Sequence, residues 1–523
     1  MKLFTLFILS LFVSQTLAQT IHLTYCDDFP KNFYARNFTT IHLESGQGYC
    51  ESPYKVLDKR IANFKKLNHL SYINEHYEDN KYVPLPKEIA KLKCLEILKT
   101  NAFDGAVFEI ENLKVLNLIY GATYKSQLAH SFDKLQKLEK LYLRFAHLDS
   151  MVTLVGVANL PNLKEVELDH PTQKIVDEVL KNRNITSLKI SRAYDVVFDF
   201  TNAKHLTRLD LNNNGLTKIP RSIYTLTNLQ SLVLSDNKID KVDPEIANLK
   251  QLKVFSIYQN WLSSLPDELL QCKLLDYLYL DYNRSLASLP ADIGELKSLK
   301  DLTASHCNLT EIPKSLEQCT DLRMLVLHHN KLTKIVLDFS KFPLLVNIKL
   351  NDNKLTSVPT SLFELPLVDE MELSNNQLTS VPASIGKMVS LTIFRANDNQ
   401  LKELPTDIGN LPLLEHLSAW NNQLIALPES IGNAKKLMYL YVGNNSIVTI
   451  PSSIKHLKVL QALEIQANPL AIFPVEVYNL PKLDRMWVSQ SHTKLKGYQA
   501  SDKNPDIIVS DKEAKEDDFG TWK

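Results

Sequence analysis

The chain has 523 residues, of which 44% are hydrophobic, and its 59 basic residues are balanced by 59 acidic ones. A formal net charge of zero gives no global field that would attract nucleic acid or an anionic membrane surface, so neither is an expected partner. The hydrophobic content is that of an ordinary folded protein. A chain of this length can form several globular domains or one solenoid that grows in a single direction.

Residues 1–18 have the layout of a secretory signal peptide. Lys2 supplies a positive charge, an apolar run extends from Leu3 to Val13, and small residues precede an expected cleavage after Ala18. The run is too short to span a bilayer, and no later stretch is long and apolar enough to do so. We therefore expect an exported protein, secreted or held at the cell surface, without an integral membrane span. An uncleaved, buried helix is the alternative.

Residues 19–66 lack the leucine pattern of the later chain and are predicted to form an N-terminal cap. Cys26 and Cys50 lie in this segment, and export would permit a disulfide between them that closes a loop and stabilises the cap. Two unpaired thiols are the alternative. Aromatic residues give the segment apolar content of its own, as a cap over the first coil requires: Tyr25, Phe29, Phe33, Tyr34 and Phe38.

Between residues 67 and 205, weaker copies of an L-x-x-L-x-L pattern recur at uneven spacing. One copy has its leucines at Leu138, Leu141 and Leu143, and Ala146 then stands where later copies carry asparagine. We predict irregular coils that continue into the regular array. A separate N-terminal domain is the alternative.

In residues 206–491 one unit repeats with a nearly constant period. The interval is 23 residues except for a single one of 24, where Arg284 or Ser285 is an extra residue. Such a period is the signature of a solenoid, in which no unit buries its leucines alone and stacking makes one continuous core. The first leucine-type residue of the unit recurs at Leu206, Leu229, Leu252, Leu275, Leu299, Leu322, Leu345, Val368, Leu391, Leu414, Leu437, Leu460 and Leu483.

The first half of each unit reads L-x-x-L-x-L-x-x-N-x-L. The alternating leucines predict a short strand with its leucines directed inward and the intervening residues outward. The short amide of the asparagine is predicted to satisfy backbone groups where the chain turns out of the strand. This ladder asparagine is found at Asn214, Asn237, Asn260, Asn283, Asn330, Asn353, Asn376, Asn399, Asn422, Asn445 and Asn468, and Cys307 replaces it in one coil.

The second half of most units reads [ILVF]-P-x-x-[ILV] and predicts a short helix. Proline suits the first turn, because the N–H that it lacks would be unpaired there anyway. Val336 replaces the proline in one coil and Pro244 comes one residue late in another, so we expect looser outer sides there. Cys272 and Cys319 hold equivalent helical positions two coils apart, too far for a disulfide, and are predicted to be small core hydrophobes.

Together these motifs resemble the leucine-rich repeat superfamily, and the L-P-x-x-I-G-x-L segment resembles the 23-residue class of Ras-scaffold and bacterial members. The resemblance implies an α/β solenoid, a curved leucine-rich repeat horseshoe with a concave parallel β-sheet and short helical or irregular convex segments. It implies a binding role without naming a ligand. Residues 492–523 form a polar tail whose apolar run is Ile507-Ile508-Val509, and part of it is expected to cover the final coil.

Function is expected in the residues between the strand leucines, since these project from the concave sheet. Two groups of aromatic side chains among them are candidate binding residues for a protein or a sugar. The alternative is that these rings pack on one another and shield the sheet. The tyrosine patch comprises Tyr258, Tyr277, Tyr279 and Tyr282, and the tryptophan patch comprises His416, Trp420, Tyr439, Tyr441 and Trp487.

Charged residues between the two patches predict a structural feature. Lys349, Glu372 and Arg395 fall on successive strands with alternating sign, which indicates a cross-strand ion ladder.

Three histidines of adjacent coils lie near acidic residues, at His306, His328 and His329. No metal-ligand spacing supports a site there, so no metal and no cofactor are predicted. The chain also lacks G-x-S-x-G, H-E-x-x-H and Walker-type motifs. The leading hypothesis is an exported leucine-rich repeat protein that binds a protein or glycan partner on its concave face without catalysis. An intracellular-type signalling scaffold is the second hypothesis, and a secreted effector or enzyme with an unrecognised site is the third.

Overall fold

The computed structural model describes residues 20–24, 33, 38–44, 57–73, 85–101, 105–120, 129–145, 153–499 and 506–509. The expected signal peptide lies outside these residues, as do Cys26 and Cys50, so the cleavage and the disulfide stay predictions. The chain divides into two compact units, residues 1–215 and 216–523.

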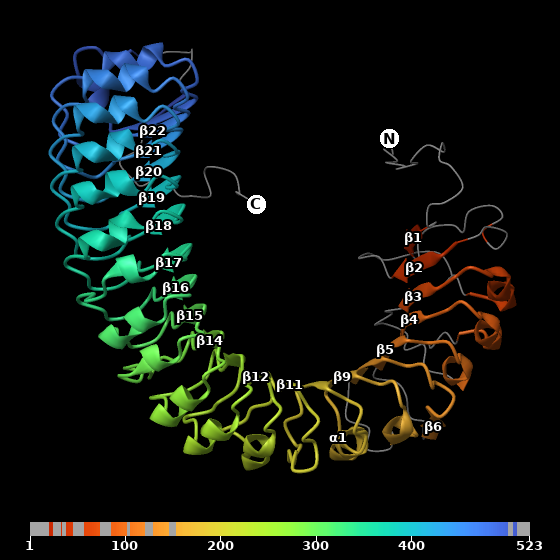
Figure 1. Cartoon of the computed structure of the whole chain (residues 1–523). Coiled ribbons are helices and arrows are strands. Elements are labelled where there is room, and N and C mark those ends of the chain that lie inside the picture. Colours follow the sequence, from red (N-terminus) through yellow and green to blue (C-terminus); the bar gives the residue numbers. More distant parts are fainter. Residues whose placement is uncertain are drawn as a thin grey trace. The chain divides into compact units, whose positions relative to one another are not determined.

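The first unit is built on parallel strands that pair in chain order (Figure 1). The register aligns the leucine positions of successive coils, so that Leu116 pairs with Leu141 and Leu141 with Val166. These strands are β1 (Thr20–Thr24), β2 (Thr40–Glu44), β3 (His69–Ile73), β4 (Ile97–Thr100), β5 (Val115–Tyr120), β7 (Lys140–Phe145), β9 (Glu165–Asp169), β10 (Ser187–Ser191) and β11 (Arg208–Asp210). Other elements are the pair β6 (Ala129–Ser131) and β8 (Thr153–Val155), helix α1 (Gln173–Leu180) and the 3-10 helices η2 (Lys59–Asn63), η3 (Lys87–Lys91), η4 (Gly105–Glu109) and η5 (Val157–Asn159).

The segment predicted to lack the repeat pattern contributes two strands of its own. Strands β1 and β2 have the sequences TIHLT and TIHLE, and they pair in parallel with each other and then with β3. This duplicated tetrapeptide is a signal that the leucine pattern alone does not reveal. Three phenylalanine rings of this region pack on one another with centroids 5.3 to 6.0 Å apart: Phe33, Phe38 and Phe64. Such packing is expected of a segment with its own aromatic content.

In the second unit the strands line the inner side of an arc and 3-10 helices line its outer side (Figure 1). Each strand pairs in parallel with the next one in the chain. The strands are β12 (Ser231–Val233), β13 (Val254–Ser256), β14 (Tyr277–Tyr279), β15 (Asp301–Thr303), β16 (Met324–Val326), β17 (Asn347–Lys349), β18 (Glu370–Glu372), β19 (Ile393–Arg395), β20 (His416–Ser418), β21 (Tyr439–Tyr441), β22 (Ala462–Glu464), β23 (Arg485–Val488) and β24 (Asp506–Val509). Strand β24 belongs to the polar tail, which confirms that part of the tail covers the final coil.

The outer side of the second unit carries short 3-10 helices, most of which follow the predicted proline motif; the helix after Val336 and the one at His492–Lys494 lack it. They are η6 (Arg221–Thr225), η7 (Pro244–Asn248), η8 (Asp267–Gln271), η9 (Ile293–Glu295), η10 (Lys314–Gln318), η11 (Phe339–Lys341), η12 (Thr360–Glu364), η13 (Ala383–Lys387), η14 (Thr406–Asn410), η15 (Glu429–Asn433), η16 (Ser452–His456), η17 (Val475–Asn479) and η18 (His492–Lys494).

Proline stands one position earlier than predicted. In most coils it is the residue before the first helical one, as at Pro220 and Pro382, where φ of −56° and −72° is combined with an extended ψ. The fixed φ of proline therefore sets the entry into the helix and not its first turn. Among the helices of the described residues, only η7 has proline, Pro244, as its first residue, and η7 keeps five residues, so the late proline does not shorten it. The coil of Val336 does have a shortened helix of three residues, and Val336 is exposed.

The ladder asparagines bond as predicted, within one coil and to the coil before it. The side-chain nitrogen of Asn260 donates to the carbonyl oxygens of Leu234 and Ile257 at 2.9 and 3.1 Å, and its oxygen accepts the N–H of Ile239 at 2.9 Å. The same contacts recur along the array, and these side chains are buried except for that of Asn422, which is half-buried. Each asparagine therefore pairs buried backbone groups that would otherwise lack partners.

Cys307 and the extra residue of the 24-residue coil are structurally linked. The Cys307 thiol donates to the carbonyl oxygens of Leu280 and Ser305 at 3.4 Å, but it cannot supply the amide oxygen that accepts an N–H from the preceding coil. In that preceding coil the inserted residue moves Leu286 so that its N–H donates to the carbonyl oxygen of Asn283 at 2.9 Å. The insertion thus removes the need for the acceptor that Cys307 lacks.

The core between coils is tightly packed. Cys272 and Cys319 are fully buried free thiols, and burial raises the pKa of Cys272 to about 11, which confirms their prediction as core residues. On the outer side, a Cβ atom at Gly409 would lie 2.0 Å from the carbonyl oxygen of Ser430 in the next coil. Only glycine permits so close an approach of two backbones.

Candidate binding face

The concave face of the second unit is formed by two outward positions on each strand. In β14 the central Leu278 is fully buried, whereas Tyr277 and Tyr279 on either side of it are half-buried on the opposite face. The same alternation in neighbouring strands places successive outward residues side by side, because parallel strands lie about 4.8 Å apart. The concave face therefore carries two columns of side chains that the core does not need.

The structure brings the tyrosine patch together as two pairs. Tyr277 and Tyr279 have ring centroids 6.3 Å apart on β14, and the Tyr279 hydroxyl lies 3.5 Å from Asp301. Burial, together with the charge of Asp301, raises the pKa of Tyr279 to about 12, so its hydroxyl is a donor at neutral pH. Tyr258 and Tyr282 form the second pair, with ring centroids 5.6 Å apart, beyond the ends of the strands.

The predicted ion ladder exists with a different arrangement. Arg395 donates to Glu370 at 2.5 Å and lies 3.5 Å from Glu372. Lys349 stands opposite Glu372 in the strand register, but its ammonium lies 3.7 Å from Glu370. Glu370 was missed because only one outward position per strand was considered, and it stands two residues before Glu372. Burial raises the pKa of Glu372, although its hydrogen bond from the N–H of Ser374 opposes that shift.

Most of the tryptophan patch is contiguous, but part of it is covered. The ring of His416 lies 5.8 Å from that of Tyr439 and 5.1 Å from that of Tyr441. Tyr441 is only 9% exposed and Trp487 only 2%, and both belong to a buried cluster against which Ile508 of β24 packs. The expectation that these two rings are exposed is therefore wrong, because they pack with Ala462 into one cluster and Ile508, in the strand next to β23, packs against that cluster.

Three polar nitrogen atoms on this face are buried without a hydrogen-bond partner among the residues that the structure describes: Nε of Arg395, Nε2 of His416 and Nε1 of Trp420. Burial and the nearby charge of Arg395 lower the pKa of His416 to about 3, so its imidazole is neutral at pH 7. The indole of Trp420 is close to the backbone of Gly443, where a Cβ atom would be 3.0 Å from the ring. Unpaired buried polar atoms are rare in folded proteins and require an explanation.

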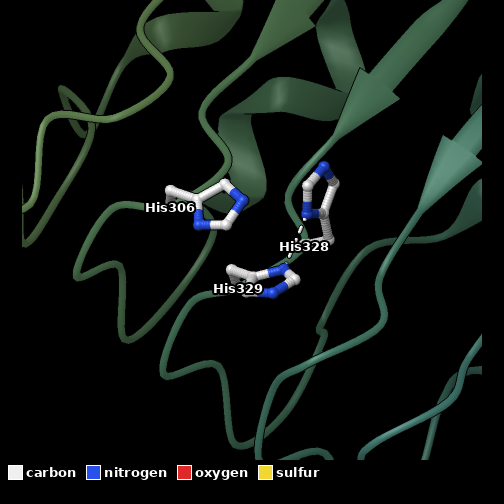
Figure 2. A group of neighbouring side chains, drawn as sticks. All are labelled: His306, His328 and His329. Atoms are coloured by element: carbon white, nitrogen blue, oxygen red, sulfur yellow. Dashed lines mark hydrogen bonds between the residues drawn. The ribbon is translucent and has the colours of Figure 1, made fainter. Parts of the chain in front are cut away.

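The three histidines of adjacent coils come together although no motif predicted it (Figure 2). Nδ1 of His328 lies 2.9 Å from Nδ1 of His329, and the ring of His306 stacks on that of His329 with centroids 4.0 Å apart. Tyr282 of the tyrosine patch stacks on the other side of His306, at 4.2 Å.

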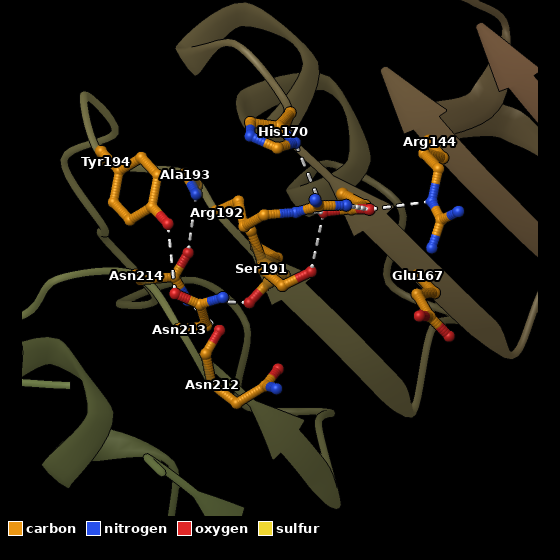
Figure 3. A network of polar contacts seen from close by, with 12 residues as sticks. Arg144, Glu167, His170, Ser191, Arg192, Ala193, Tyr194, Asn212, Asn213 and Asn214 are labelled. Atoms are coloured by element: carbon orange, nitrogen blue, oxygen red, sulfur yellow. Dashed lines mark hydrogen bonds and ion pairs between the residues drawn. The ribbon is translucent and has the colours of Figure 1, made fainter. Parts of the chain in front are cut away.

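The first unit contains a polar network that sequence reasoning missed (Figure 3). Its centre is Asp169, a buried carboxylate that accepts hydrogen bonds from Arg192, from Arg144 at 3.1 Å and from Ser191 at 3.2 Å. Burial alone would raise the pKa of Asp169, but the hydrogen bonds and charge of Arg192 outweigh it and lower the pKa. Because each charge of this network is paired within the chain, we interpret the network as structural.

Comparison with known proteins agrees with this architecture. A family model described as a leucine-rich repeat region matches residues 221–339, and a second one for the leucine-rich repeat matches residues 199–239 and 343–401. The rat volume-regulated anion channel subunit LRRC8D is 26% identical over 211 residues, which are 39% of this chain and only 22% of that relative. No helix within the described residues is long and apolar enough to cross a membrane.

Two solved structures share the fold over most of the chain. The leucine-rich repeat protein LIC12759 of Leptospira interrogans is 29% identical with a TM-score of 0.53, and the match covers 71% of this chain and 95% of that one. The Arabidopsis receptor kinase HAESA, in complex with the peptide hormone IDA and the co-receptor SERK1, is 21% identical with a TM-score of 0.60, and the match covers 92% and 80%. The repeated strands, the ladder asparagines and these matches together show that this chain belongs to the leucine-rich repeat superfamily.

Proposed function

We propose that this protein is an exported, non-catalytic binding protein that recognises a protein partner on the concave face of its second unit. The observation that carries the proposal is the group of partner-less polar atoms on Arg395, His416 and Trp420, which stands beside the half-buried ring of Tyr439. Tryptophan, tyrosine and arginine are enriched in binding hot spots, and the polar groups of buried tyrosine and tryptophan usually find a hydrogen-bond partner.

The relation to the HAESA complex supports this choice of partner class over a glycan. A shared fold at 21% identity carries no residue roles, so the support is limited to the kind of surface that such a sheet offers. Tyr441 and Trp487 are not among the proposed contacts, because both are buried. The proposed contact residues are Tyr258, Tyr277, Tyr279, Tyr282, Arg395, His416, Trp420 and Tyr439.

The test is capture of partners from the native surroundings by residues 19–523, followed by cross-linking to locate the contact. A variant with Tyr277→Ala, Trp420→Ala and Tyr439→Ala removes rings from both patches without touching the buried leucines. Trp261→Ala is the matched control, since this ring is 59% exposed and lies outside the strands. We expect a partner that the parent and the control retain and that the concave-face variant loses.

Equal retention by both variants would remove the concave face as the binding surface, provided that circular dichroism shows the same fold. A parallel glycan array tests the carbohydrate alternative, and binding there that depends on the same rings would replace the protein partner. N-terminal sequencing of the native protein tests export. A start at Gln19 is expected, whereas an uncleaved protein in the cytosol would favour the signalling scaffold.

A further inference from the structure

A column of side chains runs along the edge where the strands of the second unit end. The residue immediately before each ladder asparagine or Cys307 has a positive φ, and we call this series the rim column. It includes His306 (φ 50°), His329 (φ 56°) and Asp352 (φ 54°) in successive coils. A left-handed conformation is uncommon for such residues, and its repetition directs their side chains the same way in every coil. Two of the three clustered histidines therefore owe their proximity to the backbone of the repeat.

The ring nitrogens of the cluster are close enough to share one ion. One nitrogen from each of His306, His328 and His329 lies within 4.8 Å of the other two, and the closest pair is separated by 2.9 Å (Figure 2). Two ligands of a tetrahedral zinc ion with Zn–N bonds of about 2.0–2.1 Å are separated by roughly 3.3 Å. Small rotations of half-buried or exposed side chains would reach that geometry.

The chemical state of the cluster favours a cation. Burial and the charge of neighbouring histidines lower the pKa values of His306 and His328. A metal ion binds the lone pair of a neutral imidazole nitrogen. Oδ2 of Asp352 lies 3.3 Å from Nδ1 of His329 and accepts one hydrogen bond, from the Asn351 side chain at 2.6 Å. The other nearby carboxylate, Asp281, already accepts hydrogen bonds from Thr303 and Ser305.

We propose that His306, His328 and His329 bind one first-row transition-metal ion of the class that prefers imidazole, with Asp352 as a carboxylate ligand at the fourth position. Three imidazoles and one carboxylate form a donor set suited to Zn²⁺ or Cu²⁺ and poorly suited to Mg²⁺ or Ca²⁺. Stacking by Tyr282 holds the ring of His306 in place, as outer groups do in established metal sites. The site lies beside the tyrosine patch and does not depend on the proposed partner.

The experiment is isothermal titration calorimetry of the untagged full chain with ZnCl2 after removal of metals by EDTA and dialysis. We expect one site with micromolar or tighter affinity. His329→Ala and His306→Ala should each weaken binding by about 100-fold or more, because each removes a direct ligand and even an outer partner of a ligand is worth about 10- to 100-fold. Asp352→Asn should weaken it less, because an amide oxygen can replace the carboxylate at the cost of its charge.

Two controls keep the result specific. His456→Ala removes a solitary exposed histidine, and His42→Ala removes one of the two stacked rings of β1 and β2. Neither should change the affinity. In the parent loaded with Cu²⁺, electron paramagnetic resonance should show nitrogen couplings that His329→Ala reduces. Absence of zinc binding at about 100 µM ZnCl2, or unchanged affinity in folded His329→Ala, would overturn the site.

Discussion

Replacement of one ladder asparagine tests how much the array depends on side chain to backbone bonding between coils. Asn330→Ala removes the donor to the carbonyl oxygens of Ala304 and Leu327, at 2.7 and 2.9 Å, and the acceptor of the Leu309 N–H, at 2.9 Å. A typical hydrogen bond contributes about 1 kcal/mol to stability, and a buried group left unpaired costs about 1–3 kcal/mol. Three such groups predict a loss of about 3 kcal/mol or more.

The neighbouring coil supplies a matched control. Cys307 holds the same position but makes only weak sulfur contacts, and Leu286 does not need it as an acceptor. Cys307→Ala should therefore cost about 1 kcal/mol or less, mainly through lost packing.

Urea unfolding followed by far-ultraviolet circular dichroism gives the free energies, and hydrogen exchange of peptides around Leu309 shows where protection is lost. Exchange is needed because repeat arrays can unfold locally, so that one global free energy understates a local effect. Equal losses in Asn330→Ala and Cys307→Ala would refute the assignment of stability to the asparagine amide.

Three further predictions follow from other contacts. The pKa of His416 is about 3 in the folded protein against an ordinary 6.5, so the unfolded state binds more protons between these pH values. The free energy of unfolding of the parent should therefore fall as pH falls from 6.5 towards 3, by at most about 1.4 kcal/mol per pH unit. In His416→Gln the slope of this free energy against pH, measured by urea titrations, should be smaller. Gly409→Ala should lower the urea midpoint far more than Gly386→Ala. At Gly409 a Cβ atom would lie 2.0 Å from the carbonyl oxygen of Ser430, whereas at Gly386 it would lie 3.0 Å from the side chain of Asp407. Equal midpoints would contradict the close backbone approach. Ile508→Ser should move the fluorescence of Trp487 to longer wavelength, measured as the difference from the same change in a Trp487→Phe background; an unchanged spectrum would show that β24 does not shield the ring.

The sequence predicted the features that one repeat unit specifies for itself. The positions of the inward leucines, the ladder asparagines and the core thiols follow from residues that recur at a fixed period. The same prediction therefore applies to every coil of the array. Features that depend on several coils or on the tail were harder to predict. The burial of Tyr441 and Trp487 depends on a cluster that draws on three strands and on Ile508 of the polar tail. The contact of His306 with His329 depends on the positive φ of both residues, which the leucine pattern does not predict.

The strands β1 and β2 were missed for a different reason. In β2 the two inward positions hold Ile41 and Leu43, and Phe38 stands where later coils carry their first leucine, so a search for leucine spacing passes over this strand. Alternation of apolar and polar residues, together with the duplication itself, was the available signal.

The pairing of Cys307 with the inserted residue of the preceding coil limits how this array can change by recombination. A cysteine in an ordinary 23-residue context would leave an N–H without an acceptor, and an asparagine after the longer coil would offer an acceptor that nothing uses. The cysteine and the insertion in the two neighbouring repeats therefore compensate for each other and need to occur together. We therefore expect exchange, duplication or deletion of units to disturb the array less on either side of residues 275–321 than at a breakpoint between Asn283 and Cys307, which would separate the cysteine from the insertion.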